Sequence, residues 1–150
     1  MTTGGSREKI KIIKVGITFS TFDLLHAGHV KMLEEAKRQC DYLIVGLQLD
    51  PSIDRPEKNS PSQSIIERYI QLQGNKHVNE IVPYVSEQDL EDILRSFKID
   101  VRIIGDEYQD KNFTGRGYCE EKGIEIYYNA RDHRFSSSGL RKQVKIAEYK

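Results

Sequence analysis

The stretch Thr18-Phe19-Ser20-Thr21-Phe22-Asp23-Leu24-Leu25-His26-Ala27-Gly28-His29 joins an apolar strand pattern to a helical pattern. Its two histidines are three residues apart, so on the first turn of a helix both imidazoles project to one side. There they lie near backbone N–H groups and the positive end of the helix dipole. Gly28 between them has no side chain and lets a ligand approach the backbone closely. This pattern is typical of a phosphate-binding turn.

The residues on either side of this stretch favour that interpretation. Residues 10–17 form an apolar run typical of a strand. After the second histidine, Val30, Leu33 and Ala36 recur with helical spacing, and charged residues fill most of the other positions. A bare His-x-Gly-His pattern could equally be two ordinary histidines at a helix start. The strand, turn and helix around it are what indicate a phosphate site.

Short apolar runs alternate with helical patterns along the whole chain. Strands are predicted at residues 10–17, 42–49, 80–82, 101–104 and 124–128. Helices are predicted at residues 30–39, 64–73, 89–97, 118–122 and 138–145. This alternation predicts an α/β fold: a Rossmann-like, doubly wound sheet of five parallel strands in a single domain. Ligands of such a sheet bind beyond the carboxyl ends of its strands, where the strand order switches.

Composition agrees with one folded domain. A chain of 150 residues buries roughly 68–70% of its unfolded surface, which is enough for one hydrophobic core. We expect a flexible leader over residues 1–9, which include Thr, Gly and Ser, and a nucleotidyltransferase-like domain over residues 10–150. The 23 basic and 23 acidic residues cancel, so no overall charge attracts nucleic acid or an anionic membrane.

Cysteine usage and hydropathy predict a cytoplasmic protein. Cys40 and Cys119 are far apart and outside any metal-ligand spacing, so we expect both to be reduced thiols. The sequence has no pattern of a signal peptide and no apolar stretch long enough to cross a bilayer. Neither nucleic acid nor a membrane is therefore an expected partner.

The chain resembles the cytidylyltransferase family, in particular the glycerol-3-phosphate cytidylyltransferases. Residues 21–29 are similar to the first family signature almost residue for residue. Residues 41–45 resemble its second strand, Glu67-Arg68 its basic helix position, and residues 104–108 its Gly-Asp-acid-aromatic loop. The second signature, Arg-Thr-Glu-Gly-Ile-Ser-Thr-Thr, corresponds to residues 131–138. These keep the arginine and the run of hydroxyl residues, but the residues between those two features differ from the signature.

The resemblance implies transfer of CMP from CTP, with Mg²⁺, to a small phosphorylated acceptor. Glycerol 3-phosphate or a similar polyol or amino-alcohol phosphate would attack the α-phosphorus in line, giving a CDP-linked product and pyrophosphate. The resemblance also implies a homodimer. ATP-dependent adenylyltransferases share the His-x-Gly-His fold, so adenylyl transfer stays open, as does a nucleotide-binding protein without turnover.

The resemblance also assigns catalytic and nucleotide-binding positions. The expected catalytic groups, which would stabilise phosphate charge, are His26, His29, Lys58 and Arg131. Arg55 is the alternative to Lys58 in the loop of residues 49–61, which is long enough to fold over a site. The expected nucleotide-binding residues are Thr18, Phe19, Ser20, Thr21, Phe22, Asp23, Gly28, Arg68, Gly105, Asp106, Ser136, Ser137 and Ser138. Asp23 would orient a metal or a ligand hydroxyl, because a phosphate nucleophile needs no general base.

Acceptor binding is expected at Lys76, where the resemblance implies a family arginine, and at basic groups that depart from the family pattern. The expected residues are Lys76, Lys111, Arg116, His133 and Arg134, and no protein metal-ligand set is predicted. His133 and Arg134 replace an acid and a glycine of the family signature, and residues 110–118 are longer than the corresponding family loop. A site discriminates most strongly against ligands that leave its polar groups unpaired. These donors therefore predict an acceptor with more hydrogen-bond acceptors than plain glycerol 3-phosphate.

Overall fold

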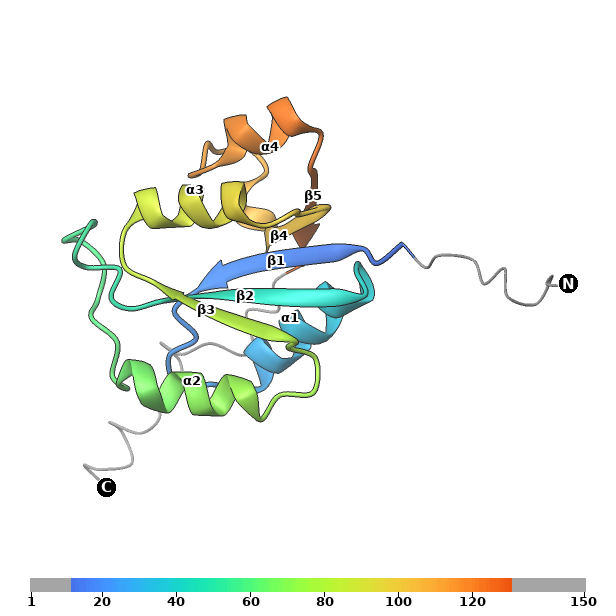
Figure 1. Ribbon diagram of the computed structural model, residues 1–150. Helices are drawn as coiled ribbons and strands as arrows, with labels where there is room; N and C mark the ends of the chain where they lie inside the picture. The colour runs from blue at the N-terminus through green and yellow to red at the C-terminus, as the bar shows by residue number, and fades with distance from the viewer. Residues whose placement is uncertain (1–11, 131–150) are drawn as a thin grey trace, which may run out of the picture.

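A five-stranded, all-parallel sheet forms the centre of the computed structural model, which describes residues 12–130 (Figure 1). The strands are β1 (Val15–Ser20), β2 (Tyr42–Gln48), β3 (Glu80–Tyr84), β4 (Val101–Gly105) and β5 (Glu125–Asn129). Their order across the sheet is β3-β2-β1-β4-β5. The order therefore reverses direction between β1 and β4, which is the switch point of the sheet. The predicted Rossmann-like, doubly wound fold is confirmed.

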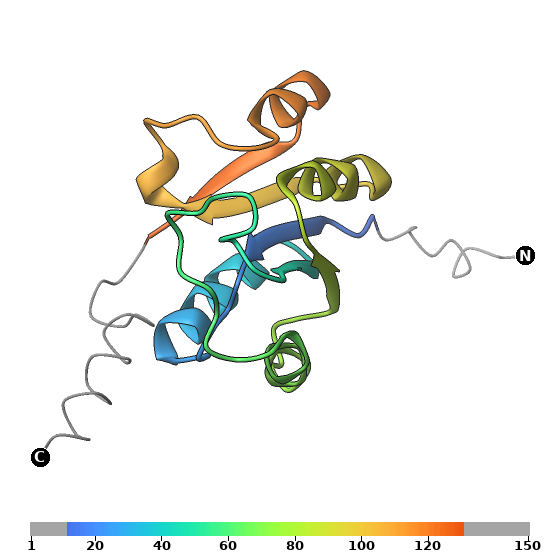
Figure 2. The same cartoon turned by 90° about the vertical axis from the view of Figure 1, so that its left-hand side faces the viewer.

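In the part of the chain that the structure describes, helices lie on both faces of the sheet (Figures 1 and 2). Helices α1 (Ala27–Arg38) and α2 (Ile65–Gln73) lie on one face, and α3 (Glu87–Ser96) and α4 (Arg116–Lys122) lie on the other. The short 3₁₀ helix η2 (Asp106–Tyr108) follows β4. Ser64 and Ser86 cap α2 and α3 through reciprocal side-chain and backbone hydrogen bonds, which satisfy the first N–H groups of each helix.

The core has two halves because side chains alternate across the sheet. On β2, Leu43, Val45 and Leu47 belong to the cluster under α1 and α2, whereas Ile44 belongs to the cluster under α3 and α4. Burying each of these side chains contributes about 1.5–3 kcal/mol. Cys119 of α4 is part of the second cluster, and both Cys40 and Cys119 are free thiols, as predicted.

Some predicted boundaries differ from the structure. The first strand begins at Val15 instead of residue 10, because its pairing with β2 starts at Val15 and Tyr42. Ile12 is 88% exposed and belongs to neither core cluster. Strand β3 extends to Tyr84 through Pro83, which an edge strand tolerates. The predicted leader at residues 1–9 and helix at residues 138–145 lie outside the described residues. None of the described helices has the length and apolar character that a bilayer span requires.

Candidate active site

Helix α1 begins with a reciprocal cap made by two histidines. His26 is the N-cap residue, and its Nδ1 accepts the backbone N–H of Gly28 at 3.0 Å. His29 Nδ1 accepts the backbone N–H of His26 at 3.2 Å. Histidine thus takes both places that a Ser or Thr and a Glu or Gln usually occupy in a capping box. The Gly28 N–H, predicted to face a nucleotide phosphate, donates to His26 instead.

These caps fix the tautomer of both rings. A neutral imidazole that accepts at Nδ1 carries its hydrogen on Nε2, so the hydrogen bonds assign an Nε2–H donor to each histidine. Burial lowers the pKa of His26 below its usual value of 6.5, which keeps this ring neutral at pH 7. The two rings stack with centroids 3.9 Å apart and planes 26° apart. The helix start therefore holds two donors side by side, at the positive end of its dipole.

A cleft of about 300 Å³ lies at the carboxyl ends of β1 and β4, where the strand order switches. Its volume falls at the lower end of the range for small-molecule sites. Of the predicted site residues, the cleft brings together Thr18, Phe19, Ser20, Thr21, Lys58 and Gly105. Neither histidine ring is among its described lining residues, although α1 contributes Met32. Asp106 is exposed and is not among them either, so its predicted ligand contact has no support in the described structure.

The aromatic wall of the cleft depends on a glycine in the neighbouring strand. The ring of Phe19 lies so close to Gly46 that a Cβ on Gly46 would be 2.2 Å from Phe19 Cδ1. Phe19 also makes an edge contact with Tyr84, with centroids 5.7 Å apart and planes at 86°. Only a residue without a side chain at position 46 lets Phe19 keep this place.

A hydrogen-bonded chain of charged and polar side chains forms the wall at β4 and α3. Arg55 Nη2 donates to Glu87 Oε1 at 2.5 Å, and the Thr114 hydroxyl donates to the same oxygen at 2.7 Å. Arg102 donates to the Thr114 carbonyl. Arg55 is the residue named as the alternative to Lys58, and both line the cleft.

Sequence reasoning missed part of this wall. The missed residues that line the cleft include Tyr84, Glu87, Arg102, Glu107, Tyr108, Phe113 and Thr114. One signal in the sequence pointed to Arg102, because an arginine inside an otherwise apolar, buried parallel strand is unusual.

The described contacts of Arg68 are with the protein backbone, and its predicted role near the phosphates stays a prediction. Its side chain is only 2% exposed, and its guanidinium donates four hydrogen bonds to backbone carbonyls. The accepting residues are Thr21, Gln48, Leu49 and Gln63, at 2.6–3.1 Å. These carbonyls come from the segments that follow β1 and β2 and from the turn before α2. Arg68 therefore links these three backbone segments to one another.

Asp23 and Phe22 also make contacts within the protein scaffold. The Asp23 carboxylate is 5% exposed and accepts the backbone N–H groups of Ser62 at 2.8 Å and Gln63 at 2.9 Å. It therefore fixes the segment before α2, and its predicted contact with a metal or a ligand hydroxyl stays a prediction. Phe22 is 1% exposed, has a φ of 50°, and packs in the core under α1 and α2. The tight turn after β1 rotates this ring inward, away from a ligand.

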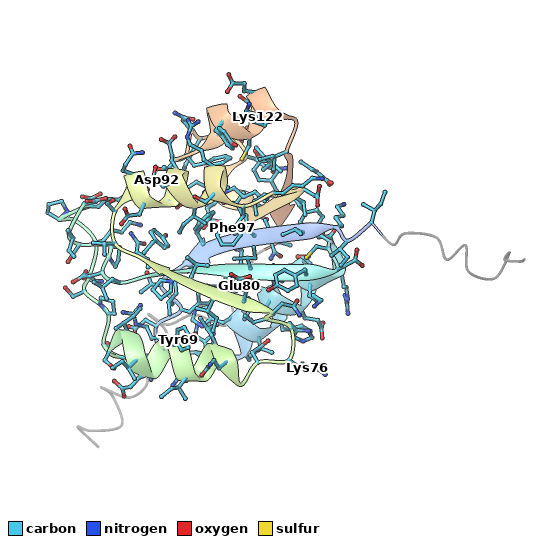
Figure 3. All side chains as sticks on the ribbon, in the orientation of Figure 1. Tyr69, Lys76, Glu80, Asp92, Phe97 and Lys122 are labelled. Carbon is cyan, nitrogen blue, oxygen red and sulfur yellow. The ribbon has the colours of Figure 1, made fainter. Side chains whose placement is uncertain are left out.

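The predicted acceptor residues lie in different places. Lys76 follows α2 and precedes β3, so it lies at the amino ends of the strands, opposite the cleft (Figure 3). Its predicted acceptor contact stays a prediction, and Lys76 is not among the described residues that line the cleft. The Lys111 carbonyl accepts from Arg116 Nη1 at 2.8 Å, which closes the loop before α4. Arg116 also lines a second hollow of about 460 Å³ that shares Arg55 and Phe113 with the main cleft.

The second predicted signature is not part of the described structure. Arg131, His133, Arg134, Ser136, Ser137 and Ser138 lie outside the described residues. Their predicted roles stay predictions. Within residues 12–130, no group of three or more His, Cys, Asp or Glu side chains could hold a metal ion.

Comparisons with known proteins agree with this geometry. Residues 17–143 match the family described as cytidylyltransferase-like. The glycerol-3-phosphate cytidylyltransferase of Bacillus spizizenii is 37% identical over 88% of this chain and 98% of that protein, and that of Bacillus subtilis is 32% identical over the same shares. A lipopolysaccharide core biosynthesis protein from Thermoplasma volcanium has the same fold, with a TM-score of 0.63 and 22% identity over 80% of this chain and 97% of that one.

Proposed function

Since this chain belongs to the cytidylyltransferase-like family of nucleotidyltransferase enzymes, we propose that it transfers CMP from CTP to a small phosphorylated acceptor. The products are a CDP-linked acceptor and pyrophosphate. One observation carries the proposal: the similarity to the Bacillus spizizenii enzyme extends over 98% of that protein, and its name specifies glycerol 3-phosphate. The acceptor class is therefore glycerol 3-phosphate or a similar polyol or amino-alcohol phosphate.

The chemistry requires position and charge more than proton transfer. A phosphate oxygen of the acceptor, already anionic at pH 7, attacks the α-phosphorus of CTP, and the bond from that phosphorus to the β-phosphate oxygen breaks. Pyrophosphate leaves with the electron pair of that bond. Holding the two phosphates in line and stabilising the charge on the equatorial and leaving oxygens are then the tasks of the enzyme.

The histidine cap of α1 is suited to stabilising charge on the phosphate oxygens. His26 and His29 each carry hydrogen on Nε2, and both rings are held by the helix backbone before any ligand binds. Donors that are fixed in advance cost no reorganisation during the reaction. Lys58 lines the cleft and would add positive charge, and we propose that Arg131 does the same.

Mg²⁺ is the cofactor that we propose for the triphosphate. This ion usually keeps several waters and binds through one or two carboxylates together with substrate phosphates. Glu107 lines the cleft and would supply one carboxylate. The described donor set fits an ion held mainly by triphosphate and water, which would neutralise charge on the triphosphate.

We also propose a homodimer, formed through the outer face of α2 and β3. Ile66, Ile70 and Val85 expose large apolar side chains there, beside an apolar groove of about 460 Å³ lined by Tyr69 and Pro83. Exposed apolar patches of this kind mark interaction sites. Light scattering is expected to give twice the chain mass, and Ile66→Glu is expected to give the single chain mass. A monomeric wild-type protein would contradict this assembly.

The test of the activity is a screen for pyrophosphate release that combines the four common nucleoside triphosphates with a panel of phosphorylated acceptors. Release is expected with CTP, and only when a phosphorylated acceptor is present. The His29→Ala variant is the matched background control. Pyrophosphate release with ATP but not with CTP would indicate adenylyl transfer instead. Binding of CTP without any pyrophosphate release would indicate a nucleotide-binding protein without turnover.

A further inference from the structure

We propose that the acceptor carries a carboxylate in addition to its phosphate, and that Arg102 is the residue that recognises this carboxylate. The inference rests on the proposed cytidylyl transfer and specifies a second anionic group on the small phosphorylated acceptor. It makes Arg102 a specificity-determining residue and gives it no part in the displacement at phosphorus.

Arg102 is a buried cation in the wall of the main cleft. It belongs to β4 at the switch point of the sheet, is only 4% exposed, and lines the cleft. The rings of Phe19 and Phe113 lie on it, with centroids 5.1 and 4.9 Å from its guanidinium carbon. These contacts fix the plane of the guanidinium, and the carbonyl of Thr114 accepts from Nη1.

The charge of Arg102 lacks a carboxylate hydrogen-bond partner within residues 12–130. The nearby acid, Glu87, accepts from Arg55 at 2.5 Å and from Thr114 at 2.7 Å. Arg102 Nε is buried and has no hydrogen-bond partner among the described residues. Buried charges are normally paired, because removing an ion from water costs several kcal/mol, and a carbonyl and two rings provide no full negative charge.

Arg68, the other buried arginine, has two carboxylates near its charge and serves as a comparison. Arg68 makes four hydrogen bonds to carbonyls, and the carboxylates of Asp23 and Asp50 both favour its charged form. Burial lowers the pKa of both arginines, and the groups that oppose this shift at Arg102 are the Cys119 thiol, the Tyr84 hydroxyl and Glu87. The anion that would complete the surroundings of Arg102 is therefore expected from a ligand.

The position of Arg102 favours the acceptor as the source of that anion. The triphosphate is expected at the histidine cap of α1, and neither histidine is among the described residues that line the cleft around Arg102. The described lining of the cleft carries three cations, Arg55, Lys58 and Arg102, against two acids, Glu87 and Glu107. A planar guanidinium matches a carboxylate in shape and charge, whereas a neutral hydroxyl would leave the excess positive charge in place.

The test compares acceptors that differ only at the proposed carboxylate. The pairs are 3-phosphoglycerate against glycerol 3-phosphate, and O-phosphoserine against phosphoethanolamine. For the wild-type enzyme, kcat/KM is expected to be about tenfold or more higher for the carboxylate member of at least one pair. Arg102→Met is expected to lower that value about ten- to hundredfold, to change the neutral member by less than about threefold, and to leave the KM for CTP unchanged.

Two variants separate recognition from folding. Arg102→Lys keeps a positive charge and is expected to restore part of the preference. Arg95→Gln removes an exposed arginine that contacts Tyr118 outside the cleft and is expected to leave kcat/KM unchanged for every acceptor.

Preference of the wild-type enzyme for the neutral member of both pairs would overturn the inference, as would an equal loss of kcat/KM for both members in Arg102→Met. If Arg102→Met does not fold, the wild-type preference alone decides. If the wild-type enzyme turns over only neutral acceptors, this inference is wrong and the proposed function stands. If it turns over no acceptor, the proposed function is wrong too.

Discussion

The imidazoles of His26 and His29 stack at 3.9 Å, and each uses its Nδ1 to accept a backbone N–H of the same helix start. One pair of side chains therefore has two tasks. The Nδ1 atoms cap α1, and we propose that the Nε2–H groups stabilise charge at phosphate. These tasks can be separated by substitution, because other residues can cap a helix without offering an imidazole donor.

The substitution His29→Ala is expected to lower kcat by about 10²–10³, which is the usual cost of losing one well-aimed donor. Circular dichroism is expected to show an intact fold. Steady-state kinetics at saturating CTP and acceptor measures the effect. A kcat near the wild-type value would remove His29 from the catalytic groups.

The substitution His26→Asn is expected to keep the cap and lose the activity. Asparagine is among the best N-cap residues, so the melting temperature at pH 7.5 should stay close to that of the wild type. The kcat should fall about as far as in His29→Ala. A large loss of thermal stability together with normal kcat would show that His26 serves only the helix.

The same variant tests the pH dependence of stability. Burial lowers the pKa of His26 below 6.5 in the folded state, so the unfolded chain binds more protons between the two values. The contribution of His26 to the free energy of unfolding therefore declines as the pH falls below about 6.5, where the protonated ring also loses its acceptor at Nδ1. Melting curves from pH 5.5 to 8 should fall less steeply for His26→Asn than for the wild type. Parallel curves would contradict the assignment.

The substitution Arg68→Met is expected to destabilise the protein by roughly 3–5 kcal/mol, as breaking a buried ionic cluster usually does. It leaves carbonyls of Thr21, Gln48 and Leu49 without their donor and removes the cation near Asp23. Urea denaturation measures the loss. Normal stability with a much raised KM for CTP would instead support the phosphate contact predicted from the family pattern.

The substitution Gly46→Ala is expected to cost about 1–3 kcal/mol and to weaken ligand binding, because the new Cβ collides with the ring of Phe19. Gly117→Ala is the matched control: no atom lies within 4 Å of its added Cβ, and the position is helical. Thermal melting of both variants, with and without CTP, makes the comparison. Equal behaviour of the two variants would contradict the role of Gly46.

The sequence predicted the sheet, its order of elements and the edge at which the site forms. Alternation of apolar runs and helical patterns is a local signal, and parallel strands bring their carboxyl ends to one edge wherever the residues between them lie. The stacked histidines followed from spacing on one helical turn. These features depend on residues close together in the chain.

The scaffold contacts that the sequence did not predict join residues far apart in the chain. Asp23 accepts from Ser62 and Gln63, about forty positions later, and Arg68 donates to Thr21, 47 positions earlier. A charged residue beside a phosphate-binding motif suggests a ligand contact. The neighbouring sequence does not show that backbone groups far along the chain form hydrogen bonds with its side chain. Arg102 was missed for the opposite reason, because a strand pattern describes its backbone and not the cleft that it faces.

Phosphorus NMR of the complete reaction tests cytidylyl transfer most directly. Wild-type enzyme, CTP, Mg²⁺ and each phosphorylated acceptor are combined, and the acceptor phosphate resonance is followed. The account predicts that this resonance disappears as a diphosphate diester appears, together with one equivalent of pyrophosphate, and that His29→Ala slows the change about 10²–10³-fold. An unchanged acceptor resonance with every acceptor, or a diester formed only from ATP, would contradict it.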